Sequence, residues 1–404
     1  MFLTEEENRK LTEVGPGTIG GEFLRRYWHP FAGLHEVTEE SPTSFFRILG
    51  EDLVLFRDKS GNVGLLADHC SHRGASLLYG RVEERGLACA YHGWLYDTQG
   101  NCLETPAEPA DSKFHLTVKH RAYPVEKLMG MYWAYLGPLP APPIRRMDIA
   151  DYPLEHIVEM IYDANWVQIV ENHVDSTHIF ILHQDTAGPG RGAVNGTTRG
   201  RIDGLASLDY EEFDFGIRRN IIPDAGQNFV EDDRVVFPNM LRRVNQVQIH
   251  SPIDDTHTRT FKLYFTDECD RARADGQGAV DYYKLQSPGE GKLSAGSYPD
   301  ARYSIAKLTS QDVMAIETQG GFAPRHNWRL GTSDRGVMLY ERMLQREMER
   351  VQQGHDPVGV VRDPSEIIDT NYAAFVQMKT GTQSSHEGLQ VYARPAGGPV
   401  GAAV

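Results

Sequence analysis

The sequence predicts an α+β protein in which a small all-β domain precedes a larger domain of helices and strands. Three observations support this division. Short runs rich in Phe, Ile, Leu and Val alternate with turn signals over residues 29–137. The Pro-rich stretch 138–144 is typical of a stiff linker. Beyond it, residues 145–392 combine helical periodicity with strand-like alternation, and a Pro/Gly/Ala-rich tail, 393–404, is expected to be flexible.

Size and composition are those of an ordinary globular chain. It has 404 residues, of which 40% are hydrophobic and 24% are charged. The sequence has no apolar run of the length that spans a membrane, and its start, MFLTEEENRKLTEVGPG, is polar and unlike a secretory signal. The net charge of −15 argues against nucleic-acid binding. We therefore expect a cytoplasmic protein with no membrane or nucleic-acid partner.

Two short helices are predicted over residues 1–28. Thr4 can cap the first helix, and Glu7, three residues later, completes a capping box. Gly15-Pro16-Gly17 ends this helix, and the second is expected to end near Trp28. Both are expected to pack on the larger domain.

The strands of the all-β domain are marked by turns. Ser44 to Phe56 is strand-like and is interrupted at Gly50-Glu51-Asp52. Another turn, Lys59-Ser60-Gly61-Asn62, precedes a strand that begins at Val63.

In the larger domain one helix is predicted from Asp163 to about Ile181, and strands from Val236 to Phe265. Residues 184–200 and 270–299 are expected to be long loops. A second long helix is predicted from Ser333 to Gln353. Its apolar stripe consists of Val337, Tyr340, Leu344, Met348 and Val351.

Two cysteine–histidine pairs in the all-β domain are the strongest chemical signal. They form C-x-H and C-x-x-H, separated by sixteen residues, and consist of Cys70, His72, Cys89 and His92. Two thiolates on one iron and two imidazoles on the other hold a [2Fe–2S] cluster of the Rieske type. The same Cys₂His₂ set can bind structural zinc. Glycines beside the ligands favour the cluster, because they let backbone amides approach its sulfurs.

The other two cysteines limit the alternatives. Cys102 and Cys269 are too few to hold a second four-cysteine cluster. We expect both to be buried, inert thiols.

A second group of metal-ligand residues lies in the first helix of the larger domain. His178 and His183 are five residues apart, and Asp175 and Asn172 precede His178 by three and six residues, on one helix face. Two histidines and a carboxylate on one face of an iron form the facial triad of non-haem Fe(II) oxygenases. The spacing alone is a weak signal, but an electron-transferring cluster earlier in the chain strengthens it.

Together these motifs resemble the Rieske non-haem iron aromatic-ring oxygenases, specifically the phthalate dioxygenase-like oxygenase components (alpha subunits). The resemblance covers nearly the whole chain. It rests on Val14-Gly-Pro-Gly-Thr18 with Arg25-Arg-Tyr-Trp-His-Pro30, both Cys/His loops, Asn165-Trp166 ahead of the helix motif, and Gln311-Asp312 with Thr318-Gln319-Gly320.

The resemblance implies one [2Fe–2S] cluster, one mononuclear Fe(II) and a helix-grip fold, an antiparallel sheet around a long helix, for the larger domain. His178 and His183 are then the expected Fe(II) ligands. The third ligand is a distant carboxylate, for which Asp312 is the first choice and Glu317 the alternative.

Two further residues receive roles from the resemblance. Asp175 is expected to bridge a histidine ligand of Fe(II) and a cluster histidine of the next subunit. Asn172 is expected to lie near the iron. Because the cluster and the Fe(II) of one subunit are too far apart for electron transfer, the resemblance also implies a homotrimer or stacked trimers.

The electrons must come from elsewhere, because Gly188-x-Gly190-x-Gly192 follows a helix and lacks the βαβ context of a nicotinamide site. The resemblance implies a separate NAD(P)H-dependent flavin/iron–sulfur reductase. The expected reaction is O₂-dependent hydroxylation of an aromatic, carboxylated compound, with O-demethylation as the alternative. A Rieske electron carrier and a non-catalytic zinc protein are the rival classes.

A carboxylated substrate would need a cationic partner. Arg199, Arg201, Arg242 and Arg243 are candidates. Neighbouring residues of a strand point to opposite faces, so at most one of Arg242 and Arg243 can face a substrate.

Overall fold

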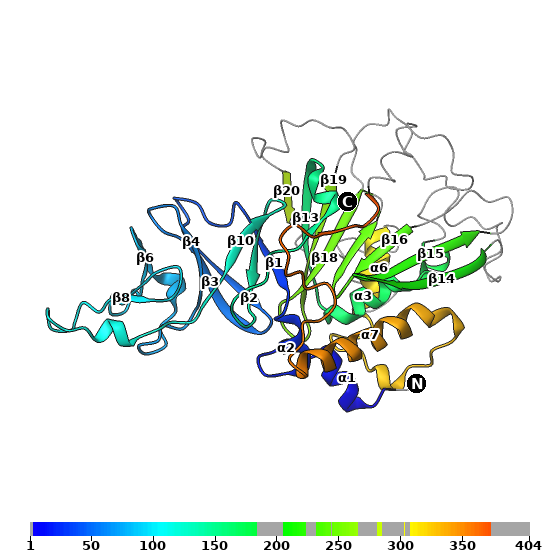
Figure 1. Ribbon diagram of the computed structural model, residues 1–404, viewed down its shortest axis with the longest axis horizontal. Coiled ribbons are helices and arrows are strands. Elements are labelled where there is room, and N and C mark those ends of the chain that lie inside the picture. The colour runs from blue at the N-terminus through cyan, green and yellow to red at the C-terminus, as the bar shows by residue number, and fades with distance from the viewer. Residues whose placement is uncertain are drawn as a thin grey trace.

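The computed structural model describes residues 3–183, 205–223, 232–243, 245–265, 281–284, 303 and 308–372. They form a β-rich part from the first third of the chain and a larger part in which helices cover a broad sheet (Figure 1). The predictions for residues 184–200, Arg199, Arg201, Cys269 and the tail from 393 lie outside the described residues, as does most of the loop expected over 270–299.

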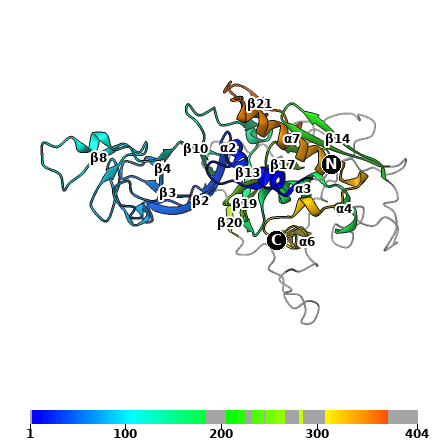
Figure 2. The same ribbon diagram turned by 90° about the horizontal axis from the view of Figure 1, so that it is seen from below.

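Two N-terminal helices, α1 (Glu5–Thr12) and α2 (Ile19–Leu24), open the chain. The predicted capping box is present: Glu7 N donates to Thr4 Oγ1 at 3.1 Å, and Thr4 N donates to Glu7 Oε2 at 2.7 Å. Both helices contact helix α7 (Arg335–Gln352) of the larger part. Figure 2 looks onto this helical side of the molecule.

The β-rich part contains three small antiparallel sheets. The predicted hairpin around residue 50 is present, and Gly50 adopts a φ of 76° in its turn. The strands are β1 (Trp28–Gly33), β10 (Val125–Leu128) and β11 (Met131–Tyr135) in one sheet; β2 (Thr43–Ile48), β3 (Glu51–Arg57), β4 (Val63–Ala67) and β9 (Ala122–Tyr123) in the second; and β5 (Arg81–Glu83), β6 (Gly86–Ala88), β7 (Leu95–Tyr96) and β8 (Cys102–Glu104) in the third. Short 3₁₀ turns lie at Leu77–Tyr79 and Phe114–Thr117.

The larger part is built on an eight-stranded sheet of order β14-β15-β16-β17-β18-β19-β13-β20. All neighbours are antiparallel except β13 and β20. The strands are β13 (Leu154–Tyr162), β14 (Leu205–Phe213), β15 (Gly216–Pro223), β16 (Asp232–Val236), β17 (Met240–Arg243), β18 (Gln246–Pro252), β19 (Thr258–Phe265) and β20 (Asp281–Lys284). Strand β20 lies inside the segment expected to be a loop, so that expectation was wrong for these four residues. A parallel pair, β12 (Arg146–Met147) with β21 (Ile367–Ile368), and 3₁₀ turns at Asp148–Asp151, Arg325–Asn327 and Thr332–Asp334 complete the part.

The helix predicted from Asp163 to Ile181 is broken in two, which corrects the sequence prediction. Helix α3 (Trp166–Val174) ends at Asp175, and α4 (Thr177–Ile181) begins after Ser176. Asp175 has extended backbone angles (φ −94°, ψ 106°), and its Oδ1 accepts from Thr177 N at 2.7 Å. The aspartate side chain thus replaces the helical hydrogen bonding and turns the chain.

The two faces of the sheet are buried against different partners. Ile157, Ile249, Phe261 and Leu263 share a core with aromatic residues of β1 and β11. On the opposite face, Leu241 and its neighbours pack against α3 and α7, and the predicted stripe of α7 is buried there. Helix α6 (Leu308–Glu317) covers the β13 side of this second face, where Val313 packs with Met160. The second face, called here the helix face, therefore lies under α3, α6 and α7.

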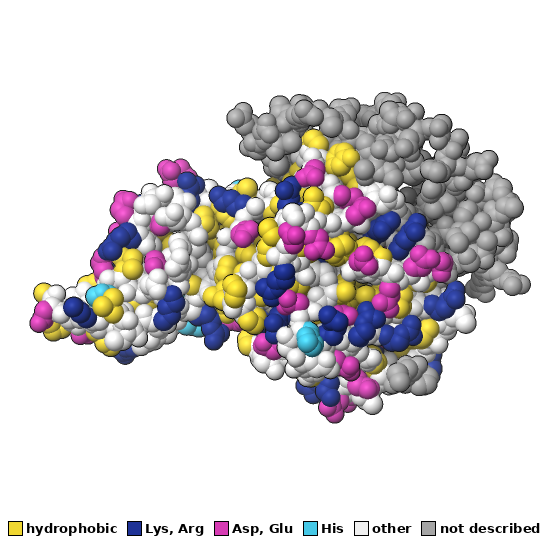
Figure 3. All heavy atoms as spheres, viewed as in Figure 1, with side chains coloured by type: hydrophobic (Ala, Val, Ile, Leu, Met, Phe, Trp, Pro, Cys, Tyr) yellow, Lys and Arg dark blue, Asp and Glu magenta, His cyan; other side chains and the backbone are white. Residues whose placement is uncertain are grey.

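The outer surface of the described residues carries both charge signs. Acidic and basic side chains are interspersed on the face seen in Figure 3. Among the helices of the described ranges, none combines the length and apolar character that crossing a membrane demands.

Candidate functional site

Two similar tight turns present the Cys/His residues of the β-rich part. Cys70 N donates to Ala75 O and Gly74 N to Cys70 O, each at 2.9 Å. The same pattern recurs in the second loop, where Cys89 N donates to Trp94 O and Gly93 N to Cys89 O at 2.9 Å. Each turn needs a left-handed residue, and the two glycines have φ of 74° and 73°.

The four side chains converge from the two turns. Both cysteines are buried, whereas His72 and His92 are partly exposed and have ring centroids 4.5 Å apart. The His72 ring also stacks on Trp94 at 4.4 Å, which fixes its orientation. Buried thiolates behind more accessible imidazoles fit a cluster whose histidine-bound iron faces the surface.

The spacing of these ligand atoms argues against a single zinc ion. Tetrahedral zinc with bonds of about 2.0–2.3 Å brings its ligand atoms within about 4 Å of one another. Among the described residues, ligand atoms of three or more His, Cys, Asp or Glu residues lie within 4.8 Å of one another in one place, at His178, His183 and Asp312 of the larger part. No three of Cys70, His72, Cys89 and His92 have ligand atoms within that distance of one another, which fits two irons better than one zinc ion.

A tyrosine supports the first cysteine. The Tyr96 hydroxyl lies 3.2 Å from Cys70 Sγ, in the apolar core beneath the two loops. Burial raises the pKa of Tyr96, so its hydroxyl keeps its proton. It can donate a hydrogen bond to a thiolate at Cys70.

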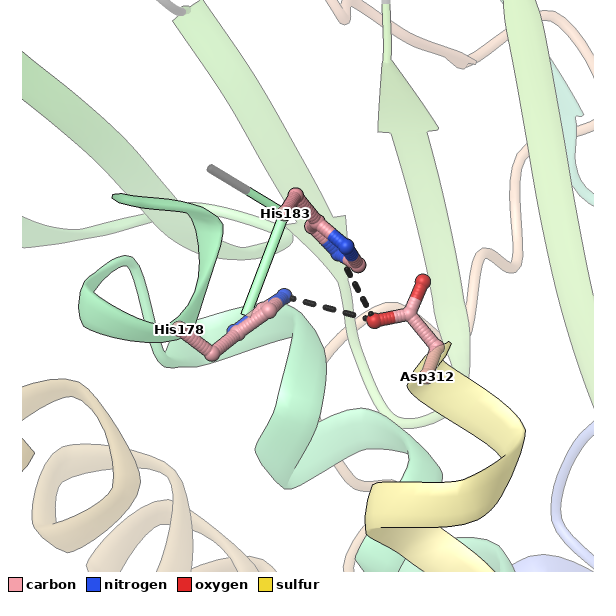
Figure 4. Close-up of side chains that lie close together, drawn as sticks. All are labelled: His178, His183 and Asp312. Atoms are coloured by element: carbon pink, nitrogen blue, oxygen red, sulfur yellow. Dashed lines mark ion pairs between the residues drawn. The ribbon is translucent and has the colours of Figure 1, made fainter. Parts of the chain in front are cut away.

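In the larger part, His178 of α4, His183 of the turn after α4 and Asp312 of α6 come together (Figure 4). Asp312 Oδ1 lies 3.0 Å from His183 Nε2 and 3.6 Å from His178 Nε2. The break at Asp175 makes this possible, because it lets the chain bring both histidines back toward α6. The three residues are called the triad below.

Polar neighbours orient both histidine rings. Gln311 Oε1 lies 2.7 Å from His183 Nδ1, and since an amide oxygen only accepts, Nδ1 carries the proton. Asp175 Oδ2 lies 3.6 Å from His178 Nδ1, too far for a hydrogen bond, but its negative charge favours a proton on that nitrogen. Both Nε2 atoms, which face Asp312, can then act as metal ligands, as in the carboxylate–histidine–metal arrangement.

The charges of the triad are mutually stabilising. Burial works against ionisation of Asp312, but its contact with His183 and the nearby charges of His178 and Lys262 hold its pKa below the ordinary value. Burial lowers the basicity of His183, but the Asp312 carboxylate outweighs it and raises the pKa of that ring. An anionic carboxylate beside two convergent imidazoles is a donor set that suits a divalent metal ion.

The alternative carboxylate is held elsewhere. Glu317 Oε2 accepts from the Tyr303 hydroxyl at 2.6 Å, and its Oε1 accepts from Asp163 N at 3.0 Å. It therefore ties α6 to the start of α3, and the geometry favours Asp312 as the third ligand.

Asn172, unlike Asp175, shows no described contact with a triad residue. It is partly buried at the end of α3, and no described hydrogen bond joins its side chain to the triad. Its neighbour His173 bonds to His250 of β18, with 2.7 Å between their Nε2 atoms, and so links α3 to the sheet.

The two candidate arginines on β17 point to opposite faces, as the strand geometry predicts. Arg242 is buried on the face away from the helices and donates to Thr370 O. Arg243 lies on the helix face, and its Nε is 3.4 Å from Asp233 Oδ2. Asp233 also forms an ion pair with Arg219.

Sequence reasoning gave no role to Gln311 or Lys262. Gln311 is signalled in the sequence only by standing next to Asp312. Lys262 lies on β19, where buried and partly exposed side chains largely alternate as on many strands, so the sequence does not single it out. Its position near the triad depends on the packing of the sheet against α6.

The chain is also similar in sequence to known proteins. Residues 27–124 match the Rieske [2Fe-2S] domain family. The chain is 34% identical to the 5,5'-dehydrodivanillate O-demethylase oxygenase subunit of Sphingobium sp. (strain NBRC 103272 / SYK-6), over 90% of this chain and 85% of that protein. It is 33% identical to the phthalate 4,5-dioxygenase oxygenase subunit of Pseudomonas putida, over 89% of each chain.

Solved structures give the same fold. The oxygenase of carbazole 1,9a-dioxygenase, in a complex with ferredoxin, aligns with a TM-score of 0.56 and 20% identity, over 86% of this chain and 95% of that one. The structural likeness thus extends through both parts of the molecule.

Proposed function

This chain belongs to the Rieske oxygenase subunits, and we propose that it is a terminal oxygenase component that hydroxylates an aromatic, carboxylated compound with O₂. One observation carries the proposal: two histidines and a carboxylate converge within 4.8 Å in the same chain as a Rieske domain. An electron-transfer protein alone would have no use for the second set of ligands.

The side chains divide the work between two centres. Cys70, His72, Cys89 and His92 would hold the [2Fe–2S] cluster. His178, His183 and Asp312 would hold one Fe(II), because two histidines and one carboxylate are the donor set of non-haem Fe(II) oxygenases. When bound, the cluster would supply single electrons and the ferrous ion would supply O₂ activation.

The remaining roles belong to the surrounding side chains. Gln311 and Asp175 hold the imidazole tautomers that expose Nε2 toward the metal position. Asp175 would also connect His178 to a cluster histidine of a neighbouring subunit in a homotrimer or stacked trimers. This role is supported by its position at the break between α3 and α4, next to a histidine of the triad.

Electrons come from a separate protein. The ferredoxin complex of a structural relative, and the description of the sequence relatives as oxygenase subunits, support a division of labour with an electron donor. We propose a flavin/iron–sulfur reductase that uses NAD(P)H, and a cytoplasmic location where that donor is regenerated. Hydroxylation inserts one oxygen atom and reduces the other to water with two electrons and two protons; dihydroxylation adds both atoms with the same two electrons and protons.

O-demethylation is the second candidate, and the O-demethylase oxygenase subunit among the relatives favours it. The test is turnover with a Rieske-type reductase, NADH and ¹⁸O₂ on a panel of aromatic acids that includes methoxybenzoates. Incorporation of ¹⁸O into a ring supports hydroxylation, and release of formaldehyde supports demethylation. Absence of substrate-dependent O₂ uptake from iron-replete protein across the panel contradicts both.

A further inference from the structure

A lysine on the helix face of the sheet forms no ion pair within the described part of the chain. Lys262 lies in the middle of β19, with Gln248 of β18 and Val158 of β13 directly opposite it. Its neighbours on the same face of its own strand are Thr260 and Tyr264. None of these four residues is acidic.

Among the described residues, no hydrogen bond or ion pair involves the Lys262 ammonium group. The Lys262 side chain is half-buried, so part of its surface remains accessible. Burial lowers the pKa of Lys262, and the nearby Asp312 carboxylate offsets this effect only in part. An unpaired ammonium group in such a place is costly, and a bound anion would relieve the cost.

Helix α6, which covers the same face of the sheet, carries Asp312 of the triad. Val158, opposite Lys262, packs against the cluster in which Val313 of α6 contacts β13. Asp312 precedes Val313 on α6, and the charges of Asp312 and Lys262 affect each other's pKa. The two groups are therefore near each other without forming an ion pair. A metal cation bound by Asp312 would neutralise the carboxylate, and Lys262 would then have no nearby negative charge from Asp312.

The arginines of this region are already ion-paired or point to the other face of the sheet. Arg243 shares Asp233 with Arg219, and Arg242 lies on the opposite face of the sheet. Among the described residues of these strands, Lys262 is a helix-face cation that forms no ion pair, whereas Arg243 forms one. A lysine ammonium is a compact point charge that can pair with one carboxylate oxygen.

We propose that Lys262 binds the carboxylate of an aromatic acid substrate and thereby positions the ring relative to the triad. This inference rests on the proposed function, which it deepens by assigning the anion-binding residue. It differs from the expectation drawn from the sequence, which considered arginines alone.

The test is equilibrium binding measured by calorimetry on anaerobic, iron-loaded protein. The probes are benzoate, phthalate, 4-methoxybenzoate and biphenyl-3-carboxylate, each compared with its carboxamide. The variants are Lys262→Met, which keeps length and removes charge, and Lys262→Arg, which keeps the charge. Lys284→Met is the matched control, because Lys284 lies on the other face of the same sheet and is paired with Glu36 and Glu159.

Wild-type protein should bind at least one carboxylate more tightly than its carboxamide. Lys262→Met should weaken that carboxylate about 30-fold or more, the loss expected when one partner of a buried charge pair is removed. The carboxamide should change by less than about threefold, and Lys262→Arg and Lys284→Met should retain the preference for the carboxylate. Equal carboxylate affinity in wild type and Lys262→Met overturns the proposal, and so does the lack of any carboxylate preference in wild type.

The number of irons per chain, measured on the same samples, distinguishes a failure of the Lys262 role from a failure of the oxygenase proposal. If wild type lacks mononuclear iron but prefers carboxylates through Lys262, the oxygenase proposal fails and the anion site stands. If iron and O₂ uptake are present while Lys262→Met binds carboxylates normally, only the role of Lys262 is wrong.

Discussion

Asp175 ends one helix and faces a histidine of the next: its Oδ1 accepts from Thr177 N at 2.7 Å, and its Oδ2 lies 3.6 Å from His178 Nδ1. The Asp175 carboxylate thus fixes the backbone turn that positions His178, and it also lies beside the His178 ring. Its pKa is held below the ordinary value, since the contact with His178 and the backbone amides outweigh the effect of burial. Asp175 is therefore a carboxylate anion beside the triad.

Asp175→Asn should separate these two roles, because the amide oxygen still accepts from Thr177 N while the charge is lost. We expect both metal centres to remain filled and the single-turnover rate with pre-reduced cluster to fall about 10–100-fold. Asp163→Asn, an exposed change just before α3, is the control. A normal single-turnover rate in Asp175→Asn would show that Asp175 is not needed for electron delivery.

Gln311→Leu should loosen metal binding without removing a ligand. The change deletes the acceptor 2.7 Å from His183 Nδ1, so the ring loses the partner that fixes its tautomer. We expect iron affinity at the triad to fall about 10–100-fold, measured as iron retained during dialysis against a chelator. Gln319→Leu, beyond the end of α6, should retain iron as wild type does. Equal retention in Gln311→Leu and wild type would contradict the role of Gln311.

Tyr96→Phe should lower the reduction potential of the cluster. The hydroxyl, 3.2 Å from Cys70 Sγ, stabilises negative charge on the sulfur, and reduction adds negative charge to the cluster. A hydrogen bond worth about 1 kcal/mol corresponds to a shift on the order of 50 mV for a one-electron couple. Redox titration followed by EPR measures it. Tyr123→Phe, which removes a hydroxyl bonded to Glu51 in the same domain, should leave the potential unchanged; a matching shift there would point to a general effect of the domain.

Glu341 should make stability depend on pH. Burial on α7, with Glu171 nearby, raises its pKa to about 7. Because this folded-state pKa is above the ordinary value of 4.5, the contribution to stability is complete below pH 4.5 and is lost as the pH rises from there to about 7. The loss is on the order of 3 kcal/mol at alkaline pH.

Glu341→Gln should therefore increase the unfolding free energy at about pH 8.5 and have little effect at about pH 5. Denaturant titration at the two pH values measures the difference. Glu349→Gln, an exposed change on the same helix, should alter neither value. A Glu341→Gln effect of equal size at both pH values would place its cause in packing rather than in ionisation.

Local signals in the sequence were enough for much of the fold. The Thr4 and Glu7 pair identified the first helix, and the stripe from Val337 to Val351 identified α7, because both depend on spacing within one element. The Cys/His loops also depend on short spacing, and residues 27–124 match the Rieske domain family. These features required no knowledge of long-range packing.

Features set by tertiary contacts were missed or left open. The break at Asp175 depends on a side-chain hydrogen bond that competes with the helix, and helical periodicity does not reveal it. The choice between Asp312 and Glu317 depends on which side of α6 faces the histidines. Lys262 became a candidate only once the pairing of β19 with β18 and β13 was known, because strand alternation alone does not say which face lies under α6.

In the proposed oxygenase, His178, His183 and Asp312 hold a mononuclear iron in a chain that also carries a Rieske cluster. The most direct measurement counts iron per chain and records EPR spectra before and after dithionite in wild type, Asp312→Ala and Glu317→Ala. We predict about three irons in wild type and in Glu317→Ala, and about two in Asp312→Ala with the Rieske signal intact. Three irons in Asp312→Ala, or loss of the third iron in Glu317→Ala alone, would contradict the account.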